Sequence, residues 1–178
     1  MVTSRFSSIG SMPTLSEANL YQILTNSVSY LQSRISTKVH LTLKSDITSI
    51  PVRINASLFE WVIENICKNA VDAMSGVGDL TIQVTQNHPE QVMIDITDTG
   101  KGIHKTKIKQ VFTPGYTTKK RGWGLGLSLA QRIVENYHKG KIYVKHSEVN
   151  VGTTFRIVLP THIAEPDQPK EKTTQVTA

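Results

Sequence analysis

Two asparagines, Asn65 and Asn69, lie four residues apart in a stretch whose apolar residues recur at helical intervals. Side chains four residues apart project side by side from one edge of a helix, so the two amides would lie together. This arrangement can present two carbonyl oxygens to a cation or to a polyphosphate. The alternative is a pair of solvated amides at the border of an amphipathic helix.

Two glycine-containing segments further along the chain could bind other parts of a ligand. At 98–102, Asp98 ends an apolar strand and could accept a hydrogen bond from an amino group on a flat heterocycle, because the glycines after it let the backbone approach. At 122–127, alternate glycines open a helix, where free backbone amides can bind phosphate. This segment lacks the Gly-Lys-Ser/Thr of a Walker loop and the preceding strand of a Rossmann fingerprint. Thr153 could donate its hydroxyl to a ring nitrogen of a base, or be an ordinary strand threonine.

The elements that must position these residues follow from the hydrophobic spacing. Helices are expected from Ser16 to residue 35, at 58–74 and at 125–137, with a short helix at 103–111. Ser16 is a candidate N-cap for the first helix, and Asn55 or Ser57 for the second. Alternating strands are expected at 39–43, 52–54, 80–85, 91–97, 142–145 and 154–159. Helices that alternate with antiparallel strand pairs predict one mixed sheet covered by helices on one face, an α/β two-layer sandwich.

The chain of 178 residues suits one domain, expected at 14–162, between a linker at 1–13 and a disordered tail at 163–178. The single cysteine, Cys67, excludes a disulfide framework, and its place on the apolar side of the second helix predicts a packed thiol. The net charge of +6 comes largely from lysines near the glycines, with few aromatics among them, so we expect phosphate binding and no nucleic-acid partner. No apolar run approaches the roughly 20 residues of a membrane helix, so no membrane contact is expected of this chain.

The order of these motifs resembles that of the GHKL, or Bergerat, ATPase superfamily, and within it the catalytic ATP-binding domain of two-component sensor histidine kinases. Four segments carry the resemblance, which are the N box at 65–70, the G1 box at 98–102, the F box at 111–119 and the G2 box at 122–127. The resemblance extends over about residues 15–160. It implies a mixed, mostly antiparallel sheet of about five strands with three helices on one face, and a flexible ATP lid at 112–124.

The same resemblance implies ATP and Mg²⁺ as cofactors. Asn69, helped by Asn65, would coordinate the Mg²⁺ that bridges the ATP phosphates, and Asp98 would accept from the adenine amino group. The residues implied as nucleotide-binding are Asn69, Asp98, Gly100, Gly102, Ile103, Phe112, Thr118, Lys119, Lys120, Gly122, Gly124, Leu125, Gly126, Leu127 and Thr153. Those implied as catalytic are Asn65, Asn69 and Lys119. Many sensor kinases carry Lys or Arg three residues after the second asparagine, where this chain has Asp72, so the lid lysines would carry more of the contact with phosphate.

The branches of the superfamily that hydrolyse ATP place a Glu, the base that activates water, one helical turn before the metal-binding asparagine. This chain has Asn65 at that position, and Glu64 lies about 140° around the helix from Asn69. The sequence therefore argues against hydrolysis and favours transfer of the ATP γ-phosphate to a histidine, which is itself nucleophilic. Two alternatives stay open, a hydrolytic ATPase of the gyrase, Hsp90 or MutL kind and a non-catalytic nucleotide-sensing module.

None of the six histidines is followed by Glu or Asp, which is the pattern of the family's phosphoacceptor. We therefore expect the acceptor on a dimerisation and phosphoacceptor domain of the same protein, upstream of this chain, and a response regulator as the downstream partner. The resemblance further implies a cytoplasmic location and a homodimeric full-length protein that could be anchored in the inner membrane. The isolated chain is expected to be a monomer.

Overall fold

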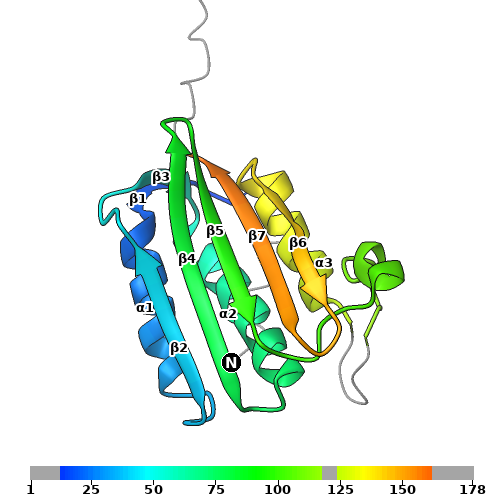
Figure 1. Cartoon of the computed structure of the whole chain (residues 1–178). Coiled ribbons are helices and arrows are strands. Elements are labelled where there is room, and N and C mark those ends of the chain that lie inside the picture. The colour runs from blue at the N-terminus through cyan, green and yellow to red at the C-terminus, as the bar shows by residue number, and fades with distance from the viewer. Residues whose placement is uncertain (1–12, 118–123, 162–178) are drawn as a thin grey trace, which may run out of the picture.

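A five-stranded sheet with helices along one face forms the body of the molecule (Figure 1). The computed structural model describes residues 13–117 and 124–161. The strands lie in the order β2 (Val39–Ser45), β4 (Gly78–His88), β5 (Gln91–Asp98), β7 (Gly152–Pro160) and β6 (Lys141–Glu148). β2 and β4 are parallel, and the other neighbouring pairs are antiparallel. The predicted mixed, mostly antiparallel sheet with helices on one face is confirmed.

The strands expected at 39–43 and 52–54 do not pair with each other, so this part of the prediction is wrong. β3 (Pro51–Ile54) pairs antiparallel with β1 (Ser16–Asn19) in a separate two-stranded sheet. β2 pairs in parallel with β4 instead. Alternating hydrophobicity identifies a strand but not its partner, because the same pattern suits any neighbour that leaves the apolar face toward the core.

The first helix, α1 (Leu20–Gln32), begins later than predicted, and Ser16 is not its N-cap. The cap is Asn19, whose Oδ1 accepts from the N–H groups of Tyr21 and Ile50, each at 3.1 Å. The residues before Leu20 are extended because they pair with β3. A long-range backbone pairing therefore overrides the local capping signal at Ser16.

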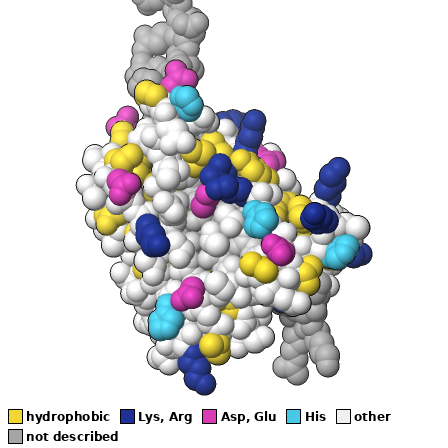
Figure 2. Space-filling model, in the orientation of Figure 1, with side chains coloured by type: hydrophobic (Ala, Val, Ile, Leu, Met, Phe, Trp, Pro, Cys, Tyr) yellow, Lys and Arg dark blue, Asp and Glu magenta, His cyan; other side chains and the backbone are white. Residues whose placement is uncertain are grey.

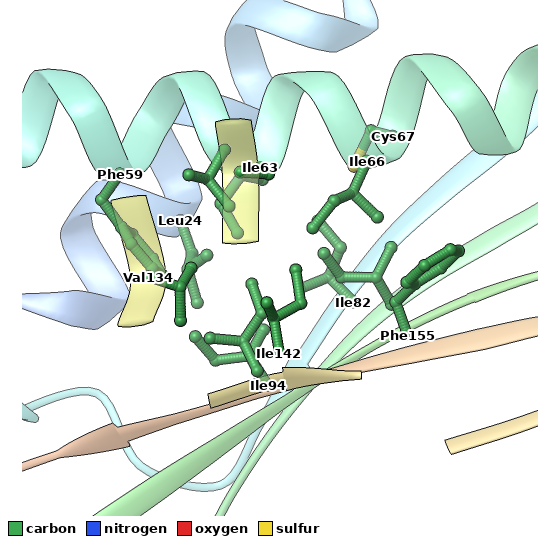
Figure 3. Close-up of a cluster of buried hydrophobic side chains, with 14 of the residues drawn as sticks. Leu24, Phe59, Ile63, Ile66, Cys67, Ile82, Ile94, Val134, Ile142 and Phe155 are labelled. Atoms are coloured by element: carbon green, nitrogen blue, oxygen red, sulfur yellow. The ribbon is translucent and has the colours of Figure 1, made fainter. Parts of the chain in front are cut away.

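The second helix, α2 (Ala56–Ala73), packs against α1, β4 and β5. Asn55, one of the two predicted caps, accepts from the Leu58 N–H with its Oδ1 at 3.1 Å. The buried side chains of α2 are Phe59, Val62, Ile63, Ile66, Cys67 and Ala70, and Figure 3 shows several of them in one cluster with side chains of the sheet. Burial, together with the nearby charge of Glu64, raises the pKa of Cys67 to about 12, so the thiol is packed and protonated, as predicted.

The third helix, α3 (Gly126–Arg132), continues into a π-helical segment, η2 (Ile133–Tyr137). The short helix predicted at 103–111 is a 3-10 helix, η1 (Lys105–Gln110). Within the described ranges, no helix has both the length and the apolar character needed to cross a membrane.

His138 joins the end of η2 to the start of α2. Its ring is fully buried and packs edge to face against Phe59, with ring centroids 5.9 Å apart. Nε2 accepts from the Asn55 N–H at 3.0 Å, so Nδ1 carries the proton and donates to the Ile133 carbonyl at 2.9 Å. Burial lowers the pKa of His138 despite these two hydrogen bonds, which favours the neutral ring that the geometry requires.

The face of the sheet turned away from the helices is open, and Figure 2 shows positive and negative side chains interspersed on it. Asp95 of β5 links three strands there, accepting from Arg156 Nε of β7 at 2.6 Å and from Lys145 Nζ of β6 at 2.8 Å. Burial alone would raise the pKa of Asp95, but the hydrogen bonds from Arg156 and Lys145 lower it. Cross-strand pairs of opposite charge therefore link β5, β6 and β7 on this face.

Candidate functional site

A cavity of about 510 Å³ opens between α2, the loop after β5 and the start of α3. Its lining includes ten of the predicted site residues, which are Asn65, Asn69, Asp98, Gly102, Ile103, Gly124, Leu125, Gly126, Leu127 and Thr153. The fold therefore brings three segments that are distant in the sequence to one site: the asparagine helix, the Asp98 loop and the second glycine segment.

Two predicted residues that the structure describes, Phe112 and Gly100, do not line this cavity. Phe112 packs edge to face against Phe155, with ring centroids 6.1 Å apart, and it is Phe155 that reaches the cavity wall. Gly100 lies behind the wall, against the backbone of α2. Thr118, Lys119, Lys120 and Gly122 lie outside the described residues, as do all residues of the expected lid from 118 to 123. So do the tail expected at 163–178 and all but the last residue of the linker expected at 1–13.

Asp98 is a buried carboxylate in the wall of the cavity, with 4% of the residue exposed. It is the last residue of β5, and the register places it opposite Thr153 of β7, so both side chains reach the same end of the sheet. Its Oδ1 accepts from the Gly100 N–H at 2.8 Å, and the Thr153 N–H also hydrogen-bonds the carboxyl. Burial raises the pKa of Asp98 in spite of these two hydrogen bonds. The carboxyl is therefore held in place and can accept one more hydrogen bond from a ligand.

The glycines after Asp98 fit the loop tightly between neighbouring backbones. A Cβ at Gly100 would lie 2.7 Å from the Ala73 carbonyl carbon, and the Lys101 N–H donates to the Ala73 oxygen at 3.0 Å. Gly102 has φ +68°, and a Cβ there would overlap the Glu148 carbonyl oxygen. Both positions therefore need glycine for the close approach, which fixes Asp98 relative to α2.

The asparagine pair also lines the cavity, and Asn65 lies beside the start of α3. Asn69 Nδ2 donates to Asn65 Oδ1 at 3.3 Å, so the oxygen of Asn65 is engaged within the pair. A Cβ at Gly126 would lie 2.6 Å from both terminal atoms of the Asn65 amide, which shows how closely α3 approaches. The two amides are adjacent, and in this conformation one donates to the other.

Glu64 is turned away from the cavity. Its carboxylate lies 3.5 Å from Lys68 Nζ, its side chain is 12% exposed, and it does not line the cavity wall. Across the described ranges, no three His, Cys, Asp or Glu side chains group as metal ligands. The amide groups of Asn65 and Asn69 bring two side-chain oxygens to the cavity wall.

Several residues of the site were not predicted. Lys101 and Lys107 add positive charge to the wall, which His104 also lines, and the cluster of lysines in the sequence was the available signal. Ser147 lies behind the wall, 7% exposed, within hydrogen-bonding distance of Thr153. The register of β6 shifts between Val144 and His146, so strict alternation could not assign Ser147 to the inner face.

Comparison with known proteins gives a consistent result. Residues 54–163 match the model of the family described as histidine kinase-, DNA gyrase B-, and HSP90-like ATPase. The sensor histidine kinase ZraS of Salmonella typhi is 34% identical over 148 residues, which are 83% of this chain and 31% of that protein. The kinase AtoS of Escherichia coli (strain K12) is 43% identical over 110 residues, which are 62% of this chain and 18% of that protein. The chain thus spans about a third or less of the length of these relatives.

Among solved structures, the nucleotide-free catalytic domain of the histidine kinase ThkA superimposes with a TM-score of 0.75 at 25% identity, over 84% of this chain and 97% of that domain. ThkA was also solved in complex with the response regulator protein TrrA, and that kinase chain aligns with a TM-score of 0.71 at 23% identity, over 83% of this chain and 42% of ThkA.

Proposed function

The chain belongs to the family of histidine kinase-, DNA gyrase B- and HSP90-like ATPases, and from this premise we propose that it is the ATP-binding catalytic domain of a sensor histidine kinase. Membership of an ATPase family supports the use of a nucleotide. The observation that carries the proposal is the placement of a buried carboxylate, Asp98, and the pair Asn65 and Asn69 in the wall of one cavity. Such a cavity suits a ligand that combines a base with phosphates.

At Asp98, the adenine amino group would donate to the buried carboxyl. The Gly100 N–H holds the carboxyl oriented, and Thr153 lies beside it in the wall. Gly102 and Ile103 would complete the surface against the ring. A base buried between a carboxyl and apolar side chains is shielded from water, which strengthens the hydrogen bond that identifies it.

At the asparagine pair, Asn69 is the proposed ligand of Mg²⁺, through its side-chain oxygen, with Asn65 orienting the Asn69 amide through their hydrogen bond. The donor set fits this ion, because Mg²⁺ is hard, takes oxygen ligands and is held through few protein groups plus phosphate oxygens. Bound there, Mg²⁺ would neutralise charge on the phosphates. The backbone amides of Gly124 and Gly126 would contact phosphate, and we keep Thr118, Lys119, Lys120 and Gly122 as proposed lid contacts.

The reaction proposed is transfer of the γ-phosphoryl group to an imidazole nitrogen of a histidine on another domain. The bond between the β,γ-bridging oxygen and the γ-phosphorus breaks, a nitrogen–phosphorus bond forms, and ADP leaves. Imidazole needs no base to attack. Hydrolysis would need a carboxylate near the water, but Asn65 stands at the position of that base, and Glu64 pairs with Lys68 instead.

The proposed partners follow from this reaction. They are a dimerisation and phosphoacceptor domain of the same protein, and a response regulator. A response regulator, TrrA, is the partner of ThkA in the complex described above. We propose a catalytic domain at 14–162, a homodimeric full-length protein and a cytoplasmic location for this domain.

Isothermal titration calorimetry with ATP, with and without Mg²⁺, tests the binding, and we expect saturation near one site per chain with a strong dependence on Mg²⁺. The Asn69→Ala variant should lose most of that dependence. Incubation with γ-labelled ATP should then leave the chain unlabelled and label a supplied phosphoacceptor domain. Steady phosphate release without an acceptor would instead indicate a hydrolase, and binding without any transfer would indicate a nucleotide-sensing module.

A further inference from the structure

Three buried polar side chains lie together at the cavity. Asp98 and Thr153 are each 4% exposed and line the wall, whereas Ser147 is 7% exposed and lies behind it. Ser147 Oγ is 2.8 Å from Thr153 Oγ1 and 3.2 Å from the Gly152 carbonyl oxygen, and it accepts from the Ile103 N–H at 2.8 Å. A buried hydroxyl with three such neighbours has a restricted choice of hydrogen bonds.

The two hydroxyl protons can be arranged in only two ways. Each hydroxyl has one proton to donate and two lone pairs to accept with, and Ser147 already accepts from Ile103. If Ser147 donates to the Gly152 carbonyl, Thr153 donates to Ser147 and can only accept from a ligand. If Ser147 donates to Thr153, the Thr153 hydroxyl keeps its own proton free for a hydrogen bond to a ligand in the cavity.

The chemistry of purine bases decides which arrangement suits a bound nucleotide. The adenine edge carries an amino donor beside the ring nitrogen N1, which is an acceptor. Asp98 accepts from the amino group, so the neighbouring wall atom must donate to N1. Guanine presents the reverse order, an acceptor oxygen beside an N1–H donor, which matches neither the carboxylate nor a donating hydroxyl.

We propose that Ser147 is a positioning residue that donates to Thr153 and thereby turns the Thr153 hydroxyl toward N1 of adenine, so that the pair helps to select adenine over guanine. This inference rests on the proposed binding of ATP with its base at Asp98. Ser147 does not line the cavity, so the proton that it donates acts on the base through Thr153. Without the Ser147 hydroxyl, Thr153 has no buried donor to satisfy its oxygen, and its proton is no longer held toward the ring.

The test compares ATP with 1-deaza-ATP, in which a C–H group replaces N1, by calorimetry in the presence of Mg²⁺. The wild-type chain should bind 1-deaza-ATP about fivefold more weakly, the size of one net hydrogen bond. Ser147→Ala should weaken the binding of ATP by a similar factor and leave the binding of 1-deaza-ATP unchanged, so that the ratio of the two affinities falls toward one. In a Thr153→Val background, Ser147→Ala should change neither affinity.

Two further variants keep the test decisive. Ser27→Ala removes another buried serine hydroxyl, in α1, and should leave both affinities unchanged. Ser147→Cys nearly preserves the side-chain volume and replaces the hydroxyl with a weak donor, so it should also lower the ratio of the two affinities. It can replace the alanine variant if that variant fails to fold.

Equal loss of both ligands in Ser147→Ala, or equal binding of both ligands by the wild-type chain, would overturn the inference while leaving ATP binding intact. A wild-type chain that binds no ATP would overturn the proposed function itself.

Discussion

Replacing Asp98 by Asn separates ligand recognition from stability at this site. The carboxyl accepts from Gly100 through Oδ1 and is also hydrogen-bonded by the Thr153 N–H. If the Asn oxygen keeps the Gly100 contact, its NH₂ group takes the place of the second oxygen. A donor then faces the donor of an adenine amino group, where an acceptor stood before.

The expected loss of ATP affinity follows from the charge and burial of the lost interaction. A hydrogen bond to a charged group contributes about 1.5–3 kcal/mol, which corresponds to a loss of roughly 10- to 100-fold. The folded protein should not lose stability to the same extent. Burial raises the pKa of Asp98, so the folded state holds a proton that the unfolded chain has released, and the wild-type free energy of unfolding falls as pH rises through that window. Asn has no such cost at neutral pH.

The assay is calorimetry with ATP and Mg²⁺ at pH 7.5 and at several lower pH values, together with urea unfolding. Wild-type affinity should fall as Asp98 takes up its proton, and the Asp98→Asn affinity should be flat over the same range. Asp95→Asn is the matched control, since Asp95 lies on the same strand with its side chain on the open face. Affinity of Asp98→Asn within twofold of wild type, or a loss of stability that matches the loss of binding, would refute the reasoning.

Three further predictions can be tested by urea unfolding. Gly102→Ala should lower the free energy of unfolding by about 2 kcal/mol or more, because φ is +68° and the added Cβ overlaps Glu148. Gly115→Ala is the control, at φ +82° with open space around it, and should lower the free energy of unfolding by less. Equal losses of stability in the two variants would argue against the overlap. Ser27→Ala should raise the free energy of unfolding by about 1 kcal/mol, since the Ser27 hydroxyl is buried without a hydrogen-bond partner. A lower free energy of unfolding in this variant would contradict the prediction. Because the pKa of His138 is lowered in the folded state, the unfolded chain takes up the proton first as pH falls. The stability of the wild-type chain should therefore decline below about pH 6.5, and His138→Gln should show a shallower decline. Identical slopes of stability against pH would rule out His138 as the cause.

Local patterns in the sequence predicted the parts of the fold that depend on local physics. The spacing of Phe59, Ile63, Ile66 and Ala70 indicated α2 and its buried face, because one helix face meets the core at that period. The partner of β2 could not be predicted, since strand pairing is a non-local choice. Asn19 displaced Ser16 as a cap for the same reason, because the pairing of β1 with β3 is a long-range contact.

At the site, residue type and spacing predicted which segments would meet, but not the residues behind them. Asp98 and Thr153 were visible as polar residues at strand ends beside glycine. Ser147 has no such signal, because a shift in strand register alone turns it inward. The hydrogen bond between Asn65 and Asn69 was likewise not predictable, since helical spacing brings two amides together without fixing which one donates.

The parallel pairing of β2 with β4 has a consequence for the folding pathway. β4 and β5 are joined by a two-residue turn, so their hairpin closes at small entropic cost, whereas β2 reaches β4 only after β3 and the whole of α2 have been ordered between them. We therefore expect the hairpin of β4 and β5 to form before β2 joins it. When the folded sheet opens locally, we expect β2 to detach before the central strands. Its amide hydrogens should therefore exchange before those of the central strands.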